Sequence, residues 1–273
     1  MKIHPAIFFS VAALLLAHNP PQAQVPRPRH GFLVVAHRGD HTQAPENTLA
    51  AYQHAIEEGV DYVEIDLRTS QDGQLVIMHD ATVDRMTNGR GMIRDLRFDS
   101  LRTLRIKDKF HPEWGEYQIP SFREVLRLCK DKIYIYLDFK NADPAKAYQE
   151  IGEFAMEKQV VVYINAAMQV TKWREAAPDM PLMVSLPDNV KDTAALRIFL
   201  TNNRFEILDG DYDQYTQDMV QLATAMGCLV LPDIQGSDEQ PGKWDKAIQM
   251  NIRALQTDHP AALIQYLSEK KLR

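Results

Sequence analysis

The chain has 273 residues, of which 45% are hydrophobic and 25% charged, and its formal net charge is -6 at pH 7. This composition is that of an ordinary globular protein, and the negative charge provides no basic field to attract polyanions, so nucleic-acid binding is disfavoured. The length suits one large domain, because barrels of alternating strands and helices commonly reach about 250 residues.

Residues 1–24 differ in composition from the rest of the chain. Lys2 is followed by an apolar run, Ala6–Ala17, and then by a Pro-rich stretch that ends near Ala23 and Gln24. This order is typical of a secretory signal peptide. The run is short for a membrane span, and no cysteine follows it to carry a lipid. We therefore expect cleavage and export, to the periplasm or outside the cell, without a stable membrane anchor. The alternative is an uncleaved anchor.

Residues 25–273 read as a single domain in which short β-branched apolar runs alternate with helical patterns, as in repeated βα units. The expected strands are Phe32–Ala36, Tyr62–Leu67, Ile133–Phe139, Val160–Ile164, Leu182–Leu186, Phe205–Leu208, Cys228–Leu231 and Arg253–Gln256. The expected helices are Thr48–Glu58, Pro144–Lys158, Ala166–Ala177, Val190–Asn202, Gln214–Met226, Lys243–Met250 and Ala261–Lys271. Asn47 is the expected N-cap of the first helix. Eight strands favour a (β/α)8 barrel, although periodicity alone is equally compatible with a doubly wound open sheet.

The alternation breaks between about residues 74 and 120. A short strand, Leu75–Met78, precedes a polar stretch that contains Gly and Arg. We interpret this interval as a small insertion after the second barrel strand. Connections that follow barrel strands lie at the catalytic face, so the insertion is expected to overhang the pocket and to help select the substrate.

Acidic residues stand at the ends of two expected strands. Glu64 and Asp66 point to the same side of the second strand, because side chains alternate with a period of two. Asp138 ends the third strand. Oxygen ligands of this kind suit Mg²⁺ or Ca²⁺, whereas a Zn²⁺ site more often recruits His or Cys. The alternative is a solvent-facing acidic pair on an edge strand.

Two basic residues accompany these acids. Lys140 shares a strand face with Asp138, and Arg38 follows the first strand. A phosphodiester site needs cationic groups to neutralise the charge that develops on phosphorus, and Arg38 is suited to a bidentate phosphate contact. Alternatively, Lys140 forms a structural ion pair with Asp138.

Two histidines stand at positions suited to proton transfer. His37 ends the first strand, and His79 follows the short strand Leu75–Met78. Cleavage of a phosphodiester needs one group to accept a proton from the nucleophile and another to protonate the leaving alkoxide, and two imidazoles can do both. Taken singly, each histidine has a structural alternative, but the pair together with three acids favours catalysis.

These motifs occur in one order along the chain. They are His37-Arg38-Gly39, Pro45-Glu46-Asn47-Thr48, Glu64-x-Asp66, Asp72-Gly73 followed by His79-Asp80, and Thr257-Asp258-x-Pro260. In this combination the chain resembles the glycerophosphodiester phosphodiesterase family over essentially the whole length that follows residue 24. The resemblance implies a (β/α)8 barrel and one divalent cation held by Glu64, Asp66 and Asp138. It also implies that His37 and His79 are the catalytic pair. We favour His37 as base and His79 as acid, and the alternative is that the two exchange roles across successive steps.

The resemblance further implies that Arg38 and Glu46 organise the site or touch phosphate, and that Lys140 contacts the substrate phosphate. The implied reaction is hydrolysis of a small glycerophosphodiester to an alcohol and glycerol 3-phosphate, by way of glycerol hydroxyl attack and a cyclic phosphate. One alternative is a lysophospholipase D or another exported phosphodiesterase that acts on lipid or envelope substrates. Another is a catalytically silent binding protein on the same barrel.

The sequence departs from the family pattern at two places. Many members have Glu where this chain has Asp138, but the shorter acid should still reach a metal. The family's late Trp-Thr segment is replaced by Leu229–Gly236, which leaves the headgroup preference open. Asp209, Asp211 and Asp233 follow later strands and are candidates to line the pocket, or else ordinary surface acids.

Overall fold

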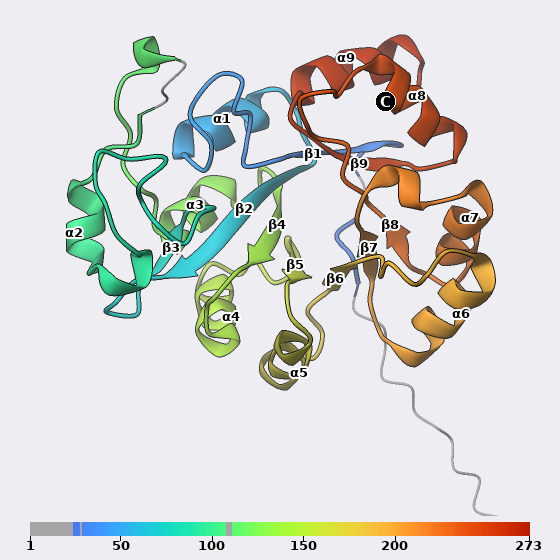
Figure 1. Ribbon diagram of the computed structural model, residues 1–273, viewed down its shortest axis with the longest axis horizontal. Coiled ribbons are helices and arrows are strands. Elements are labelled where there is room, and N and C mark those ends of the chain that lie inside the picture. The colour runs from blue at the N-terminus through green and yellow to red at the C-terminus, as the bar shows by residue number, and fades with distance from the viewer. Residues whose placement is uncertain (1–23, 28, 108–110) are drawn as a thin grey trace, which may run out of the picture.

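The computed structural model describes residues 24–27, 29–107 and 111–273, and the strands of this part of the chain form a parallel barrel (Figure 1). The barrel strands are β1 (Leu33–Ala36), β2 (Tyr62–Thr69), β4 (Tyr134–Phe139), β5 (Val160–Ile164), β6 (Leu182–Ser185), β7 (Ile207–Asp209), β8 (Leu229–Val230) and β9 (Ala254–Thr257). Neighbouring strands pair in the order β8-β7-β6-β5-β4-β2-β1-β9.

The ring closes between the segment that follows β8 and strand β9. The amide of Ile234 donates to the carbonyl of Gln256 at 3.0 Å, and the amide of Gln256 donates to the carbonyl of Pro232 at 3.0 Å. In an open doubly wound sheet, the two outer strands do not pair with each other. The predicted (β/α)8 barrel is therefore confirmed, and the open-sheet alternative is excluded.

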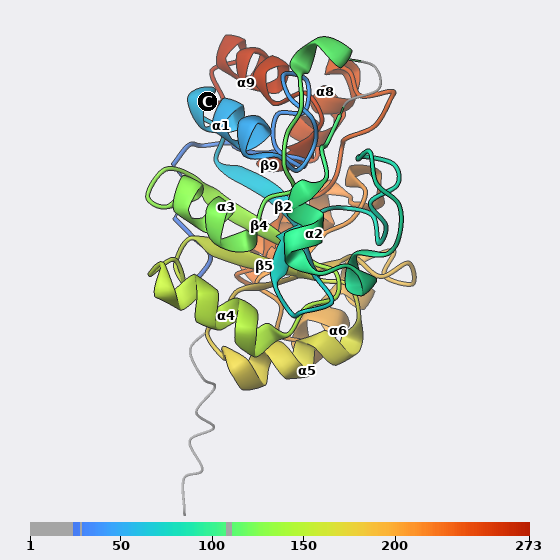
Figure 2. The same cartoon turned by 90° about the vertical axis from the view of Figure 1, so that its left-hand side faces the viewer.

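Each barrel strand leads to a helix on the outside of the barrel; Figure 2 shows α3, α4 and α5 lying outside β2, β4 and β5. The helices are α1 (Leu49–Glu57), α3 (Phe122–Cys129), α4 (Pro144–Glu153), α5 (Ala167–Ala176), α6 (Thr193–Asn202), α7 (Gln217–Ala225), α8 (Pro241–Gln249) and α9 (Pro260–Glu269). Local signals set several starts. Asp143 caps α4 by accepting a hydrogen bond from the amide of Lys146 at 3.1 Å, and Pro144 occupies the first turn.

Alternation along the strands divides the apolar residues into two layers. Val34 and Ala36 face the helices, whereas Leu33 and Val35 face the interior of the barrel. The interior layer is apolar towards the beginnings of the strands. Polar residues therefore occupy the inward positions that remain near the strand ends, as Asp66 does on β2. This arrangement places the buried acids at the mouth of the barrel.

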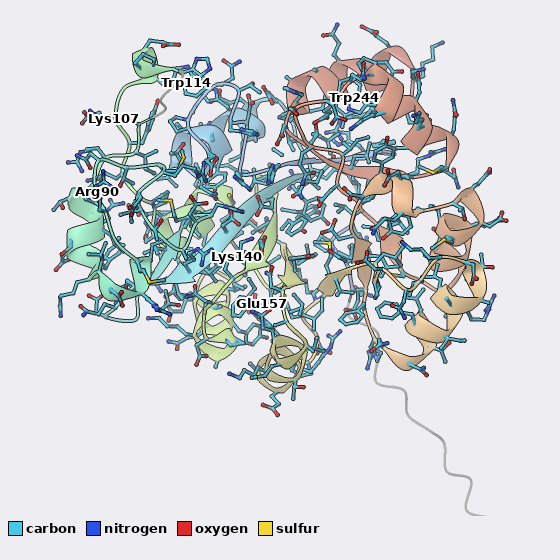
Figure 3. All side chains as sticks on the ribbon, viewed as in Figure 1. Arg90, Lys107, Trp114, Lys140, Glu157 and Trp244 are labelled. Atoms are coloured by element: carbon cyan, nitrogen blue, oxygen red, sulfur yellow. The ribbon has the colours of Figure 1, made fainter. Side chains whose placement is uncertain are left out.

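The predicted insertion is a small unit with its own apolar cluster. It contains strand β3 (Leu75–Ile77), which pairs antiparallel with β2, and helix α2 (Phe98–Thr103). The cluster consists of Val76, Met78, Val83, Met86, Ile93, Leu101, Ile106 and Ile119. Figure 3 shows Arg90, Lys107 and Trp114 of the insertion at one side of the molecule, whereas Lys140 lies near its middle. The insertion therefore flanks the barrel beside β2.

The prediction that Asn47 caps helix α1 is wrong. Thr48 is the N-cap, and its Oγ1 accepts a hydrogen bond from the amide of Ala51 at 3.2 Å. Asn47 adopts a left-handed backbone with φ of 57°. Its side-chain amide donates to Asp66 Oδ2 at 2.7 Å, and its oxygen accepts from the Tyr52 hydroxyl at 2.7 Å. Tertiary contacts therefore use the side chain that local propensity assigned to the helix end.

The predicted signal peptide lies almost entirely outside the described residues. Among the residues that the structure describes, no helix is both long enough and apolar enough to cross a membrane. Export therefore stays a prediction.

An acidic pair joins the loop that follows β1 to the end of α1. Asp40 is fully buried, and its Oδ2 and the Oε2 of Glu58 are buried without a donor from the described residues. Burial, and then contact with Asp40, raise the pKa of Glu58 from 4.5 to about 8. A proton that Glu58 keeps and shares in a hydrogen bond with Asp40 explains both observations.

This pair predicts a stability that falls as pH rises. Between about pH 4.5 and 8, Glu58 ionises in the unfolded chain but keeps its proton in the folded protein, so stability is lost across that window. Glu58→Gln supplies a donor that does not titrate. We expect the variant to exceed the parent by about 1 kcal/mol at pH 8, because solvent screens this half-buried group, and to match it at pH 4. Urea unfolding at both pH values measures the difference. Exposed Glu57→Gln is the control, and a gain independent of pH would contradict the shared proton.

Candidate active site

A cavity of about 280 Å³ opens at the carboxyl ends of the barrel strands. Its wall includes seven of the eight residues that the sequence predicted, namely His37, Arg38, Glu64, Asp66, His79, Asp138 and Lys140. They come from β1, β2, β4 and the segment after β3. Glu46, the eighth, is not part of this wall. The fold therefore brings together residues that are far apart in the sequence, such as His37 and Lys140, which are 103 positions apart.

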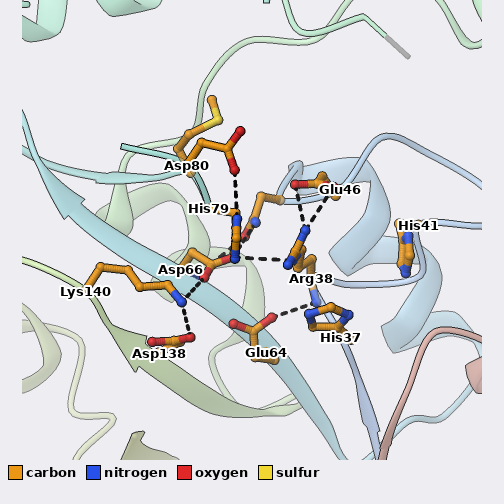
Figure 4. A network of polar contacts seen from close by, with 12 residues as sticks. His37, Arg38, His41, Glu46, Glu64, Asp66, His79, Asp80, Asp138 and Lys140 are labelled. Carbon is orange, nitrogen blue, oxygen red and sulfur yellow. Dashed lines mark hydrogen bonds and ion pairs between the residues drawn. The ribbon is translucent and has the colours of Figure 1, made fainter. Parts of the chain in front are cut away.

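Three carboxylates meet on one side of the cavity (Figure 4). Asp66 and Asp138 are direct neighbours in the parallel pairing of β2 with β4. Glu64 lies two residues before Asp66, so it points to the same side of β2. One oxygen from each of the three lies within 4.8 Å of the others. Burial raises the pKa of Glu64 well above its usual range, and the charges of Asp66 and Asp138 raise it further. The repulsion among these acids would be relieved by a cation bound between them.

Polar neighbours orient each of the three acids. The amide of Arg38 donates to Glu64 Oε2 at 2.8 Å. Asn47 holds Asp66 as described above, and Asn165 Nδ2 donates to Asp138 Oδ1 at 2.6 Å. Each acid thus has one oxygen fixed by a donor, which is how proteins hold metal-binding carboxylates in place.

Lys140 lies between two of the acids. Its Nζ forms an ion pair with Asp138 Oδ2 and lies 3.1 Å from Asp66 Oδ1. Burial alone would lower the pKa of Lys140, but Asp66 and Asp138 outweigh it and raise the pKa. The lysine therefore stays charged and offsets part of the negative charge.

Glu46 links two arginines. Arg38 NH1 lies 3.2 Å from both carboxylate oxygens of Glu46, and Arg85 donates to the same two oxygens at 2.7 and 3.0 Å. Burial would raise the pKa of Glu46, but these two guanidinium groups outweigh it and lower the pKa. Figure 4 shows Glu46 on the far side of Arg38 from Glu64. This position fits a role in organising the site.

His37 is held by an aspartate from the other end of the chain. Its Nδ1 contacts Asp258 Oδ1 at 2.7 Å, which leaves Nε2 for the cavity. His41 Nε2 contacts the same oxygen at 3.0 Å. Burial would raise the pKa of Asp258, but its contacts with His37 and His41 outweigh this effect and lower the pKa. Asp258 is therefore an anion that fixes the ring of His37. The sequence motif included this residue without indicating its role.

His79 has an equivalent partner on its own loop. Its Nδ1 contacts Asp80 Oδ1 at 2.8 Å, and Arg85 Nε donates to Asp80 Oδ2 at 2.7 Å. The hydrogen bond from Arg85, with a smaller contribution from His79, lowers the pKa of Asp80. Arg68 Nε also donates to the carbonyl of His79 at 3.0 Å. Both histidines are thus oriented by an ionised acid, and in both the Nε2 atom remains for chemistry.

The turn between His37 and α1 requires glycine. Gly39 has φ of 82°, and a Cβ atom at this position would lie 2.8 Å from both the carbonyl carbon and the Cβ of Ala51. Any side chain there would push the loop away from α1. Because the same loop carries Arg38, whose amide donates to Glu64, Gly39 supports the position of Glu64.

Comparison with known proteins identifies the family. Residues 37–262 match the model of the glycerophosphoryl diester phosphodiesterase family. The chain belongs to this family. A glycerophosphodiester phosphodiesterase from Caldanaerobacter subterraneus is 36% identical to this family member over 137 residues. That alignment covers 48% of the chain and 56% of the relative, so the chain spans little more than half the length of that relative.

Solved structures of the family share the fold. A glycerophosphodiester phosphodiesterase from Agrobacterium tumefaciens superimposes with a TM-score of 0.75 at 24% identity, over 84% of this chain and 97% of that one. A phosphodiesterase from Oleispira antarctica was solved with the product sn-glycerol-3-phosphate. It gives a TM-score of 0.74 at 22% identity, and the superposition covers 86% of the present chain and 96% of the Oleispira chain. These two structures share the fold of this chain, and the family-model match over residues 37–262 confirms the family that the sequence motifs indicate.

Proposed function

We propose that the protein hydrolyses glycerophosphodiesters to an alcohol and glycerol 3-phosphate. Family membership supports the reaction class. The observation that carries the proposal is that three clustered acids and two aspartate-backed histidines line one cavity. A binding protein without activity would not require such a combination of acids and oriented imidazoles.

We propose that Glu64, Asp66 and Asp138 hold a divalent cation. The clustered oxygen donors and the raised pKa of Glu64 fit a hard ion such as Mg²⁺ or Ca²⁺. When bound, such an ion would neutralise negative charge on the phosphate oxygens.

In the proposed mechanism, the two histidines transfer protons. His37 Nε2 accepts the proton of the attacking hydroxyl, which belongs to water or to the glycerol moiety. Attack by water gives glycerol 3-phosphate directly, whereas attack by the glycerol hydroxyl gives a cyclic phosphate that water then opens to glycerol 3-phosphate. As the new phosphorus–oxygen bond forms, the bond to the leaving alcohol breaks, and His79 Nε2 donates a proton to the departing oxygen. Asp258 and Asp80 hold the rings so that Nε2 faces the cavity in each case.

Arg38 and Lys140 are the proposed phosphate contacts. Arg38 Nε is buried without a hydrogen-bond acceptor among the described residues, and it lies 3.8 Å from Asp66 Oδ2. A phosphate oxygen would supply the missing acceptor. Lys140 already lies between Asp66 and Asp138, so it is placed to contact a phosphate bound at the same cation. Glu46 would act by holding Arg38.

Asp258 is proposed to be a positioning residue. We expect Asp258→Asn to lower kcat about a hundredfold with little change in KM, because His37 loses the anion that fixes its ring. Asp258→Glu should restore part of the rate. Steady-state kinetics measures both, and exposed Asp238→Asn is the matched control. A fall confined to KM, or a loss of folded protein with unchanged specific activity, would argue against this role.

A substrate panel tests the proposed function. Purified protein is incubated with glycerophosphocholine, glycerophosphoethanolamine and lysophosphatidylcholine, each with Mg²⁺, Ca²⁺ or a chelator. We expect turnover of the glycerophosphodiesters that the chelator abolishes. Faster turnover of lysophosphatidylcholine would favour the lysophospholipase D alternative. Absence of metal-dependent turnover on every diester would favour a binding protein.

We also propose that the protein is exported after removal of residues 1–24. The order of the charged, apolar and Pro-rich stretches supports this proposal. Mass spectrometry of the protein recovered from its native cells should find a new amino terminus near Val25. Recovery of the intact amino terminus would contradict it.

A further inference from the structure

The cavity has a second polar wall opposite Glu64, Asp66 and Asp138, which we call the metal-site acids. Its members are Asp209 at the end of β7, Asp233 and Gln235 after β8, and Gln256 on β9, and we call these four residues the acceptor wall. In the ring of strands, β7 lies four places from β2, and β8 lies four places from β4. The acceptor wall therefore faces the strands that carry Glu64, Asp66 and Asp138.

The acceptor wall carries unpaired acceptors. Asp209 and Gln256 are 2% and 4% exposed. Their Oδ1 and Oε1 atoms are buried without a hydrogen-bond partner among the described residues, as is the Oε1 atom of Gln235. Buried acceptors without donors cost free energy, so such atoms are satisfied by ordered water or by a bound group.

Two side-chain donors of this region contact the carboxyl groups of the acceptor wall. The Tyr136 hydroxyl donates to Asp209 Oδ2 at 2.8 Å, and Gln256 Nε2 donates to Asp233 Oδ1 at 2.5 Å. The second contact fixes the amide of Gln256, because a carboxylate can receive only from the nitrogen side. The oxygen of Gln256 is thus a true free acceptor. The buried side-chain atoms of the acceptor wall that lack a partner among the described residues are therefore all oxygen acceptors.

The two acids of the acceptor wall lack, within the described part of the chain, the Arg and Lys partners that the acids on the opposite side of the cavity have. Among the described residues, no ion pair includes Asp209 or Asp233, whereas Arg38 and Lys140 pair with Glu46, Asp66 and Asp138. Burial, and then the neighbouring charge of Asp233, raise the pKa of Asp209 well above its usual range. A positively charged group would stabilise both carboxylates.

We propose that the acceptor wall binds a primary ammonium group on the leaving alcohol. This inference rests on the proposed function and adds the substrate class, a glycerophosphodiester of an amino alcohol such as ethanolamine. A primary ammonium offers three N–H donors and one positive charge to the unpaired acceptors. A quaternary ammonium has the charge without N–H donors, and a polyol has donors without the charge.

The position suits a leaving group. Tyr136 and Asp138 are two residues apart on β4, so both side chains point into the barrel. Tyr136 touches Asp209 on the acceptor wall, whereas Asp138 belongs to the metal-site acids. A phosphodiester bound at the acids would therefore extend its alcohol across Tyr136 towards the acceptor wall.

The first test needs no variant. Wild-type kcat/KM is measured for glycerophosphoethanolamine, its N-methyl and N,N-dimethyl derivatives, glycerophosphocholine and glycerophosphoglycerol. We expect kcat/KM to fall with each methyl group and to be about tenfold lower for the choline and glycerol diesters. Equal values, or a preference for choline or glycerol, would overturn the inference while leaving the proposed function intact. Failure to cleave any of the five would instead refute the proposed function.

The second test locates the preference. Asp209→Asn and Asp233→Asn should each reduce the ratio of kcat/KM for glycerophosphoethanolamine to that for glycerophosphocholine about tenfold, mainly through KM. The matched control is Asp211→Asn, because Asp211 is exposed and is not part of the cavity wall. A ratio that neither variant changes, or that the control changes equally, would contradict the assignment to this wall.

Discussion

Replacing His37 or His79 with Ala is expected to lower kcat about a hundredfold or more, because in the proposed mechanism each imidazole carries one of the two proton transfers. KM should change little, since the phosphate contacts assigned to Arg38 and Lys140 remain. The measurement is steady-state hydrolysis of a glycerophosphodiester at saturating metal concentration. The two losses should not add when the substitutions are combined, because both groups serve one reaction step.

His54→Ala is the matched control for these variants. His54 lies on helix α1, and 42% of its side chain is exposed, so its loss should leave the rate unchanged. Folding of each variant is checked by thermal unfolding. A near-normal rate for either His37→Ala or His79→Ala would remove that residue from the mechanism.

Replacing Glu64 with Gln is expected to have the larger effect, a fall in kcat/KM of about a thousandfold, because the proposed cation loses an anionic ligand and its charge stabilisation. Binding of Mg²⁺ or Ca²⁺, followed by calorimetry, should weaken by at least about a hundredfold. The loss should come from binding and chemistry together, whereas a purely structural role would lower only the yield of folded protein.

The substitution Glu64→Gln, which is expected to lower activity, is not expected to lower the stability of the metal-free protein. Since burial and the charges of Asp66 and Asp138 raise the pKa of Glu64, its ionised form opposes folding at neutral pH. Glu64→Gln should therefore unfold at a temperature equal to or above that of the parent when a chelator is present. Glu57→Gln, on the exposed side of α1, controls for removal of a negative charge. Unchanged metal affinity in Glu64→Gln would exclude this acid as a ligand.

Much of the fold is predictable because the strands are short, apolar and separated by helical patterns. Closure of the barrel is not predictable from that alternation, because it depends on hydrogen bonds between the segment at Pro232 and Ile234 and the distant residue Gln256. The acids and histidines at the strand ends favour the barrel indirectly. Groups that act at one site must lie at the same end of the fold, and a barrel brings its strand ends together there.

Helix α3 is absent from the predicted helices, although its start carries a local signal. Ser121 and Glu124 form a capping box in which the Ser121 hydroxyl accepts from the amide of Glu124 at 3.2 Å and Glu124 Oε2 accepts from the amide of Ser121 at 2.8 Å. A Ser-x-x-Glu pattern before an apolar run is recognisable in sequence. Asn47 shows the opposite case, because a good local cap candidate is used instead to hold Asp66.

The cluster of acids could be anticipated because its geometry follows from strand alternation. The residues that orient the site could not be anticipated from the sequence, because their side chains come into contact only when the chain folds. Asp258 is 221 residues from His37, and Arg85 joins Glu46 to Asp80 across the boundary between barrel and insertion. The acceptor wall likewise becomes visible only when its donors and acceptors are counted in three dimensions.

Crystals soaked in Mn²⁺ and measured at an anomalous wavelength test the central claim most directly. We expect one anomalous peak in the cavity, about 2.0–2.6 Å from oxygen atoms of Glu64, Asp66 and Asp138. Lys140 should then turn from these acids towards the space for phosphate. No peak between the three acids, in protein that remains active, would contradict the claim that they hold the cation used in catalysis.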